Sequence, residues 1–326
     1  MNKTLLTVNV VTYNHRPWIE QCLDSILEQE TDFGFIVRIF DDCSTDGTTD
    51  ICKQYAEKYP DKVYFYPTEK NLGPRDNPLR SYQGITTPYY LYIEGDDYRI
   101  DKHGFQEQVD ILEKHPECSF CAAKTVNLEN GDLVHSHPNF SKGIYSKDFI
   151  LQNPSLYKHA NLGVRIVRTK CINFVKNNEE YYLWDISQFY ELFESGSMYF
   201  IDKDYMVYRM TMNGLATSKN GLEIVIYMSN LANMYIKYKK DYYENIMYVV
   251  EMELMASILR EEAKRICKNA KNENICKKKK NTKRLIKNLE KGAKLITPPI
   301  FHHLCHFIRD YLRKLKKTKK EHSNDA

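Results

Sequence analysis

The chain has 326 residues, of which 42% are hydrophobic and 28% are charged. This composition excludes a disordered or fibrous protein and is typical of a globular chain with one large domain and an appendage. No run of about 18 apolar residues occurs, so we expect no membrane-spanning helix. The first apolar stretch is interrupted by Asn9 and Thr12, and we interpret it as a strand rather than a signal peptide.

The distribution of charge along the chain and the spacing of the cysteines both bear on the class of protein. The net charge of +4 combines an acidic body with a basic tail, because residues 264–326 carry 20 Lys and Arg against 5 Asp and Glu. Nine cysteines follow no disulfide pattern, which favours a reducing cytoplasm. Cys118 and Cys121 have the spacing of a zinc knuckle, but no second pair matches them, so we expect buried apolar side chains.

Strand and helix patterns alternate along the first part of the chain. The expected strands are 6–11, 35–40, 63–66, 89–93 and 118–126, and the expected helices are 18–27, 51–56, 79–85 and 105–113. Asn130-Gly131-Asp132 is typical of a hairpin turn. This order predicts an α/β fold, with a mostly parallel central sheet that has helices on both faces.

Two acidic doublets follow predicted buried strands. Asp41-Asp42 comes directly after the strand at 35–40, and Asp96-Asp97 comes soon after the strand at 89–93. Neighbouring carboxylates repel each other, and ligands of open α/β sheets bind at the carboxyl ends of the strands. The doublets therefore predict a site for a nucleotide and a divalent cation.

Four motifs occur in a fixed order, namely VNVVTYNH from Val8, DDCSTDGT from Asp41, NLG from Asn71 and EGDDY from Glu94. Together they resemble the family-2 glycosyltransferases with the GT-A fold, over roughly residues 4–215. The resemblance implies an inverting enzyme that transfers a sugar from a nucleotide-diphosphate donor, with a UDP-sugar favoured. It also implies an acceptor hydroxyl on a growing, lipid-linked surface glycan such as lipooligosaccharide, capsule or O-antigen.

The first two motifs supply groups for the nucleotide. Thr12, Tyr13 and Asn14 offer a hydroxyl and a ring that can hold a pyrimidine by hydrogen bonding and stacking; the alternative is a turn with a packed tyrosine. Asp41 and Asp42 can accept hydrogen bonds from uracil or ribose, and the resemblance favours Asp42 for the base. We expect the following Ser44 to Asp46 segment to cap a helix.

Asp96 and Asp97 stand where the family has its acidic metal motif. The resemblance implies that Asp97 binds Mn²⁺ or Mg²⁺ and that Asp96 faces the metal or the ribose; the alternative is a solvated acidic loop. Glu94 replaces the more usual Asp of this motif. Arg75 and Arg80 can bind diphosphate oxygens, with Arg75 favoured by the resemblance and a surface role for either as the alternative.

A general base is expected in the segment YYLWDISQFY. Asp185 is a carboxylate among aromatic residues, which can raise its pKa, and the resemblance places the family's catalytic carboxylate here. The alternative is a helix N-cap, and Glu191 and Glu194 are weaker candidates. Further on, Tyr208-Arg209 resembles a pair at the family's closing strand.

The domain prediction has three parts. Residues 1–218 form the GT-A domain, and 219–268 form a helical extension that packs on the body or on a second copy in a homo-oligomer. Residues 269–326 form a basic amphipathic helical tail, suited to an anionic membrane surface, which predicts a cytoplasmic, peripheral protein on the inner face of the cytoplasmic membrane. Nucleic acid is not expected as a partner, because no nucleic-acid motif accompanies the charges.

Two other functions fit parts of the sequence. A sugar-nucleotide pyrophosphorylase shares a nucleotide-binding sheet, but its Gly-rich N-terminal loop is missing, since residues 1–33 contain no Gly. A catalytically silent nucleotide-sugar-binding protein, recruited to the membrane by the basic tail, is the second alternative. The intact acidic residues Asp42, Asp97 and Asp185 favour the enzyme.

Overall fold

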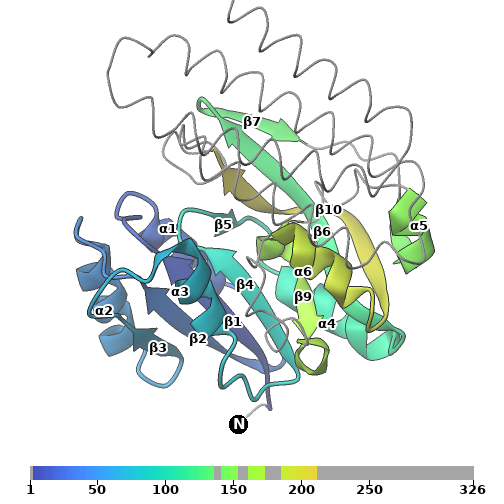
Figure 1. Cartoon of the computed structure of the whole chain (residues 1–326), viewed down its shortest axis with the longest axis horizontal. Coiled ribbons are helices and arrows are strands. Elements are labelled where there is room, and N and C mark those ends of the chain that lie inside the picture. Colours follow the sequence, from blue (N-terminus) through green and yellow to red (C-terminus); the bar gives the residue numbers. More distant parts are fainter. Residues whose placement is uncertain (1–2, 136–140, 153–160, 173–184, 211–326) are drawn as a thin grey trace, which may run out of the picture. The chain divides into compact units, whose positions relative to one another are not determined.

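The computed structural model of the chain describes residues 3–135, 141–152, 161–172 and 185–210 (Figure 1). The chain divides into two compact units, Met1–Lys219 and Asn220–Ala326. The second unit lies outside the described residues, so the helical extension and the basic tail stay predictions. Within the described part, no helix is long and apolar enough to cross a membrane.

The described strands form one mixed sheet in the order β3-β2-β1-β4-β9-β6-β10-β5, with β7 paired to β6 and β8 paired to β10. The strands β3, β2, β1 and β4 are parallel, and β10 is parallel to β6, while β9 is antiparallel to both β4 and β6. Their bounds are β1 Thr4–Thr12, β2 Gly34–Asp41, β3 Val63–Tyr66, β4 Tyr89–Glu94, β5 Tyr98–Arg99, β6 Cys118–Glu129, β7 Asp132–His135, β8 Gly143–Tyr145, β9 Ile166–Arg168 and β10 Ser197–Arg209.

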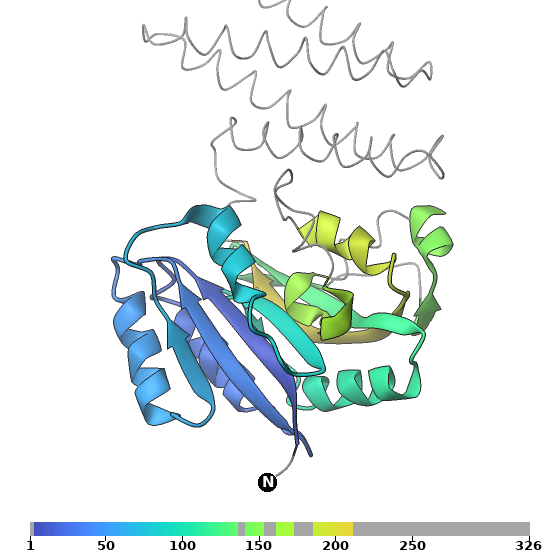
Figure 2. The same cartoon turned by 60° about the horizontal axis from the view of Figure 1, so that its bottom comes forward.

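Helices cover both faces of this sheet, as the sequence predicted (Figures 1 and 2). One apolar core lies under α1, α2 and α4, and a second lies under α3, α5 and α6. The bounds are α1 Ile19–Leu27, α2 Thr48–Lys58, α3 Gly73–Ser81, α4 Gly104–Lys114, α5 Lys147–Gln152 and α6 Asp185–Leu192, with short 3₁₀ turns at Leu162–Val164 and Thr169–Cys171.

The central strand β1 explains how the sheet is buried on both faces. Its alternate residues Leu6, Val8 and Val10 are fully buried in the first core. On the opposite face, the Thr7 hydroxyl lies 2.6 Å from that of Thr87, the Asn9 side chain donates to the Ser81 carbonyl, and Val11 packs in the second core. Burial on both faces is typical of a parallel strand between helices, and it brings the carboxyl end of β1 to a covered edge.

The position of α3 differs from the prediction. Helical spacing predicts a helix at 79–85, whereas α3 spans Gly73–Ser81. Pro74 lies in its first turn, where a helix needs no N–H donor, and Gly84 adopts a left-handed φ of 67° soon after its end. The prediction was wrong because this start depends on proline and on a distant cap rather than on apolar periodicity.

Other local predictions are confirmed. Asn130 and Gly131 have φ values of 52° and 95°, and they join β6 to β7 in a two-residue hairpin turn. Cys118 and Cys121 are buried in β6, as expected of small apolar side chains.

Candidate functional site

Orphaned polar atoms mark one end of the sheet. Thr12 Oγ1, His15 Nδ1, Asp96 Oδ1 and Arg209 Nε are buried and have no hydrogen-bond partner. They belong to the segments at the carboxyl ends of β1, β4 and β10. Buried polar groups are nearly always hydrogen-bonded, so several orphans at one strand edge indicate a place that a polar ligand completes.

Asp96 and Asp97 are the centre of this edge. They are 9% and 2% exposed, and Asp97 Oδ1 accepts the backbone N–H of Arg209 at 2.9 Å. Burial raises the pKa of Asp97 well above its usual value, and the charges of Asp96 and Glu94 add to the effect. Two buried carboxylates side by side favour a cation between or beside them.

Asp96 and Asp97 supply oxygen ligands of the kind that a divalent cation binds. Across the described ranges, no three His, Cys, Asp or Glu side chains gather as a metal cluster. Asp96 and Asp97 supply two carboxylates, and Mg²⁺ is commonly held by one or two carboxylates together with substrate phosphates and waters. These residues therefore fit a cation shared with a diphosphate, and they do not form a complete protein cage.

Gly95 seats the acidic loop on the end of β1. Its backbone N–H donates to the Val11 carbonyl at 2.9 Å. A Cβ at this position would lie 2.8 Å from Thr12 Oγ1 and 2.9 Å from Ile19 Cδ1. The close approach requires glycine and brings the loop carboxylates next to the Thr12 hydroxyl.

Both residues of the first acidic doublet, Asp41 and Asp42, accept hydrogen bonds from other groups of the protein. Asp42 Oδ1 and Oδ2 accept the backbone N–H groups of Leu72 and Gly73 at 2.7 and 2.8 Å, at the start of α3. Asp41 has no exposed surface, and its carboxylate lies 2.5 Å from Ser44 Oγ and 2.6 Å from Thr49 Oγ1. The sequence did not reveal these contacts, and nucleotide contacts for Asp41 and Asp42 stay predictions.

The loop after β1 holds Tyr13 at the surface. Asn14 adopts a left-handed φ of 55°, its Oδ1 accepts the Thr45 N–H at 2.8 Å, and its own N–H donates to Ser44 Oγ at 2.9 Å. The neighbouring Tyr13 side chain is 44% exposed. Asn14 thus ties the loops after β1 and β2 together and leaves the Tyr13 ring available.

The N-cap residue of α2 is Gly47, one residue after the predicted segment, but Asp46 of that segment accepts a hydrogen bond from the helix start. Asp46 Oδ1 accepts the backbone N–H of Thr48, the first residue of α2, at 3.0 Å, and Asp46 Oδ2 accepts the Arg16 N–H at the same distance. The segment after the first doublet therefore has the structural role that its residue types predict.

Arg75 and Arg80 both belong to α3, but only the contacts of the Arg80 side chain are described. Arg80 Nη2 donates to the carbonyls of Tyr66 and Asp41 at 2.7 and 3.1 Å, so its guanidinium joins the ends of β3 and β2. Arg75 belongs to α3, but its side chain lies outside the described part, and its predicted diphosphate contact is untested.

Asp185 is the first residue of α6, and its side chain also lies outside the described part. One turn later, Gln188 is buried and its Oε1 accepts the Tyr82 hydroxyl at 3.1 Å. The helix that begins at Asp185 is therefore fastened to α3 and its surroundings. The role of Asp185 as a base stays a prediction.

His15 and Arg209 belong to the site although they were not selected as site residues from the sequence. His15 Nε2 lies 3.9 Å from Asp96 Oδ2, and burial lowers the pKa of the imidazole despite that carboxylate. Their sequence signals are the place of His15 in the first motif, directly after Asn14, and the resemblance of Tyr208-Arg209 to a pair at the family's closing strand.

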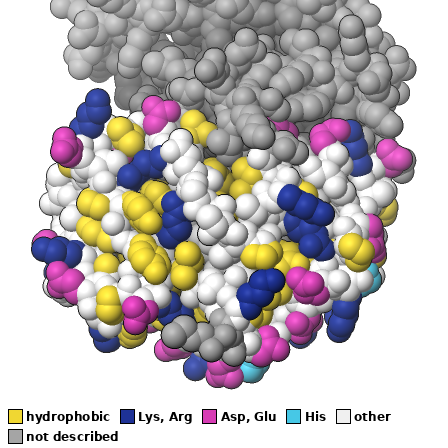
Figure 3. All heavy atoms as spheres, turned by 90° about the horizontal axis from the view of Figure 1, so that it is seen from below, with side chains coloured by type: hydrophobic (Ala, Val, Ile, Leu, Met, Phe, Trp, Pro, Cys, Tyr) yellow, Lys and Arg dark blue, Asp and Glu magenta, His cyan; other side chains and the backbone are white. Residues whose placement is uncertain are grey.

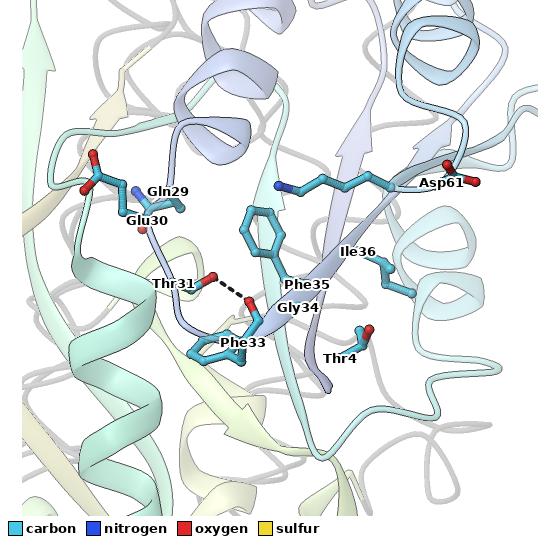
Figure 4. Close-up of a pocket in the computed structure, with 10 residues that line it drawn as sticks. Thr4, Gln29, Glu30, Thr31, Phe33, Gly34, Phe35, Ile36 and Asp61 are labelled. Carbon is cyan, nitrogen blue, oxygen red and sulfur yellow. Dashed lines mark hydrogen bonds between the residues drawn. The ribbon is translucent and has the colours of Figure 1, made fainter. Parts of the chain in front are cut away.

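A depression of about 560 Å³ lies at the opposite edge, where β1 and β2 begin (Figure 4). There the Lys62 ammonium lies 3.7 Å from the centroid of the Phe35 ring. Charged side chains of both signs are interspersed with apolar ones on the face seen in Figure 3. None of the predicted site residues lines this depression, so it is separate from the acidic edge.

The sheet and its acidic carboxyl edge define the GT-A fold class, and solved structures have the same architecture. Staphylococcus aureus TarS 1-349 in complex with UDP-GlcNAc matches with a TM-score of 0.62 and 18% identity, covering 97% of this chain and 92% of that one. The Pyrobaculum calidifontis mannosyltransferase PcManGT, in complex with GDP-Man and Mn²⁺, matches with a TM-score of 0.52 and 15% identity, covering 95% and 85%. The predicted fold is confirmed.

The family model for glycosyl transferase family 2 matches residues 7–186, and the chain belongs to that family. The processive diacylglycerol beta-glycosyltransferase of Mycoplasma pneumoniae is 22% identical over 74% of this chain and 73% of its own length. The dTDP-rhamnosyl transferase RfbG of Shigella flexneri is 39% identical over 42% of this chain and 45% of its own length. The uncharacterized protein Rv1520 of Mycobacterium tuberculosis is 29% identical over 47% of this chain, and the chain spans only 46% of that relative.

Proposed function

We propose that this protein is an inverting glycosyltransferase that transfers a sugar from a nucleotide-diphosphate donor, with a UDP-sugar favoured, to a hydroxyl of a growing surface glycan. The main support is the buried pair Asp96 and Asp97, which lies beside the unpaired Thr12 hydroxyl at the carboxyl edge of the sheet in a chain of glycosyl transferase family 2. An anionic, cation-bearing donor matches that edge in charge and in hydrogen-bonding capacity.

The donor nucleotide is proposed to lie over the ends of β1 and β2. The Tyr13 ring is exposed and offers a stacking surface, and Thr12 offers a hydroxyl without a partner. Asp42 orders the first amides of α3, which shapes the wall of this pocket, and Arg75 of the same helix would bind the diphosphate. The UDP-GlcNAc named for the TarS structure favours uridine.

Asp96 and Asp97 are proposed to hold Mn²⁺ or Mg²⁺. The bound cation would neutralise the diphosphate and so stabilise the leaving group. The Mn²⁺ named for the PcManGT structure supports this choice of ion. A cation held by the two carboxylates would relieve the repulsion between their charges.

Asp185 is proposed as the base that takes the proton from the acceptor hydroxyl. A single in-line displacement at the anomeric carbon then breaks its bond to the diphosphate and inverts the configuration. The base lies at the start of α6, whose next turn is fixed by the Tyr82–Gln188 hydrogen bond. A fixed helix start favours reproducible placement of the base.

The acceptor is proposed to be a lipid-linked surface glycan of the lipooligosaccharide, capsule or O-antigen kind. The name of the Mycoplasma relative, a processive diacylglycerol beta-glycosyltransferase, supports a lipid acceptor. The basic segment 269–326 would hold the protein at the inner face of the cytoplasmic membrane, and 219–268 would pack on the body or form a homo-oligomer.

The test is a donor panel. Release of the nucleotide, a diphosphate from UDP-, GDP- and dTDP-sugars and CMP from CMP-sugars, is measured with Mn²⁺ or with EDTA, in the presence of an acceptor extract. We expect one donor class, a UDP-sugar, to turn over with Mn²⁺ and not with EDTA. Donor binding without any turnover would instead favour the silent binding protein. Formation of a sugar 1-phosphate and a nucleoside triphosphate on addition of pyrophosphate would favour a pyrophosphorylase.

A further inference from the structure

Arg209, at the carboxyl end of β10, touches three elements of the site edge. Its backbone N–H donates to Asp97 Oδ1 at 2.9 Å, and its guanidinium carbon lies 4.8 Å from the centroid of the Tyr98 ring. Its Nη2 donates to Gln21 Oε1 of α1. The Arg209 side chain thus joins α1 to Tyr98, the residue after Asp97, while the backbone N–H of Arg209 holds Asp97 itself.

The same strand also holds the far side of the loop. In the antiparallel ladder, Met206 pairs with Arg99 and Val207 pairs with Tyr98, so β5 is fixed on β10 immediately after the acidic residues. On its near side, the loop is seated on β1 through Gly95. The loop is therefore held at both ends, and Arg209 acts on the residues between them.

The positive charge of Arg209 also favours its position beside the acidic loop. Glu94, Asp96 and Asp97 follow one another closely in sequence at the end of β4, and the positive charge of Arg209 acts on Asp97. A guanidinium is charged at all ordinary pH values, and it can stack on a ring and donate sideways at once.

We propose that Arg209 is a positioning residue that fixes the acidic loop of residues 94–98 in the conformation that receives the donor diphosphate and its cation. The identity of that ligand rests on the proposed function, but the fixing is a property of the ligand-free protein. Lysine cannot replace arginine here, because an ammonium group lacks the planar surface that lies over Tyr98 and the fork that reaches Gln21.

The first test needs no ligand. Hydrogen–deuterium exchange of peptides covering residues 94–99 is compared in the full chain for the wild type, Arg209→Met and Arg209→Lys. We expect exchange at the loop to be about tenfold faster in both variants, which corresponds to about 1.4 kcal/mol of lost protection. Peptides of β2 should be unchanged.

The matched control is Lys203→Met on the same strand. Its ammonium pairs with Glu107 at 2.6 Å on the surface, away from the acidic loop. This change should leave exchange at 94–99 as in the wild type. Equal loop exchange in the wild type and Arg209→Met would overturn the proposal, as would an equal acceleration in the Lys203 control.

The second test measures Mn²⁺ and UDP affinity by calorimetry. Arg209→Met should weaken both by about tenfold and raise the donor KM more than it lowers kcat. If that variant does not fold, Gln21→Leu, which removes only the contact to α1, should loosen the loop by about threefold, and no loosening would overturn the proposal. A wild type that binds no nucleotide defeats the proposed function, whereas the exchange result judges Arg209 alone.

Discussion

The buried charge of Asp97, which the proposed function requires, lowers the stability of the folded protein. It is 2% exposed, and burial together with Asp96 and Glu94 raises its pKa well above the usual carboxyl value. Between the unfolded and folded pKa values, the folded state holds the proton more tightly than the unfolded state does. The free energy of unfolding therefore falls as pH rises through this range.

Asp97→Asn should consequently be more stable than the wild type without metal at neutral pH, by roughly 1–2 kcal/mol, because a neutral amide replaces a buried charge. The advantage should shrink as pH falls to about 4, near the ordinary carboxyl pKa. Urea unfolding in EDTA across that range measures it. Equal pH dependence in the two proteins would show that the buried charge carries no such cost.

The acidic loop requires a residue without a side chain at position 95. Gly95→Ala places a Cβ 2.8 Å from Thr12 Oγ1, so the loop must shift, and we expect a loss of roughly 1–3 kcal/mol of stability with weaker donor binding. Gly143→Ala is the control, since nothing lies within 4 Å of its added Cβ. Chemical denaturation and UDP titration should separate the two variants, and identical losses would contradict the packing described for Gly95.

At the scale of elements, Asp42 connects the end of β2 to the start of α3. Asp42→Ala leaves the partly buried N–H groups of Leu72 and Gly73 without their acceptor and should cost roughly 1–3 kcal/mol, with faster exchange at residues 71–75. Asp50→Ala, an exposed carboxylate in the first turn of α2, is the control and should cost under about 1 kcal/mol. A loss at Asp42 no larger than at Asp50 would show that this link is weak.

Elements with strong local patterns could be predicted from the sequence. The strands β1 to β4 and the Asn130-Gly131 hairpin follow from apolar runs and turn residues. The strand β9 is three residues long, and its antiparallel place between β4 and β6 depends on tertiary pairing that no local pattern reveals. The start of α3 depends on Asp42, which lies 30 residues earlier than Leu72.

The candidate site divides in the same way. The acidic pair Asp96 and Asp97 could be located because an apolar strand leads into it. Arg209 lies 112 residues after Asp97, and no spacing rule joins them. The engagement of Asp41 by Ser44 and Thr49 was equally hidden, because a carboxylate in a motif looks the same whether it faces a ligand or a hydroxyl of the protein.

At the scale of the whole molecule, the acidic body and basic tail predict a salt-dependent membrane association. The full chain should float with vesicles that contain anionic lipid and not with neutral ones, and high salt should release it. Glutamate at the four lysines 277–280 should weaken binding by roughly a thousandfold, because the loss of four positive charges at roughly 1 kcal/mol each amounts to about 4 kcal/mol. Equal binding to neutral vesicles would contradict an electrostatic role for the tail.

The most direct test of the central claim is release of nucleoside diphosphate from a UDP-sugar with Mn²⁺ and acceptor extract, comparing the wild type with Asp97→Asn. Asp132→Asn is the matched control, because that carboxylate is exposed on β7. We predict turnover in the wild type and the control, and a loss of at least about a hundredfold, or about 2.7 kcal/mol in the barrier, in Asp97→Asn while the protein remains folded. Equal turnover in all three proteins would contradict the assignment of the acidic edge as the donor site.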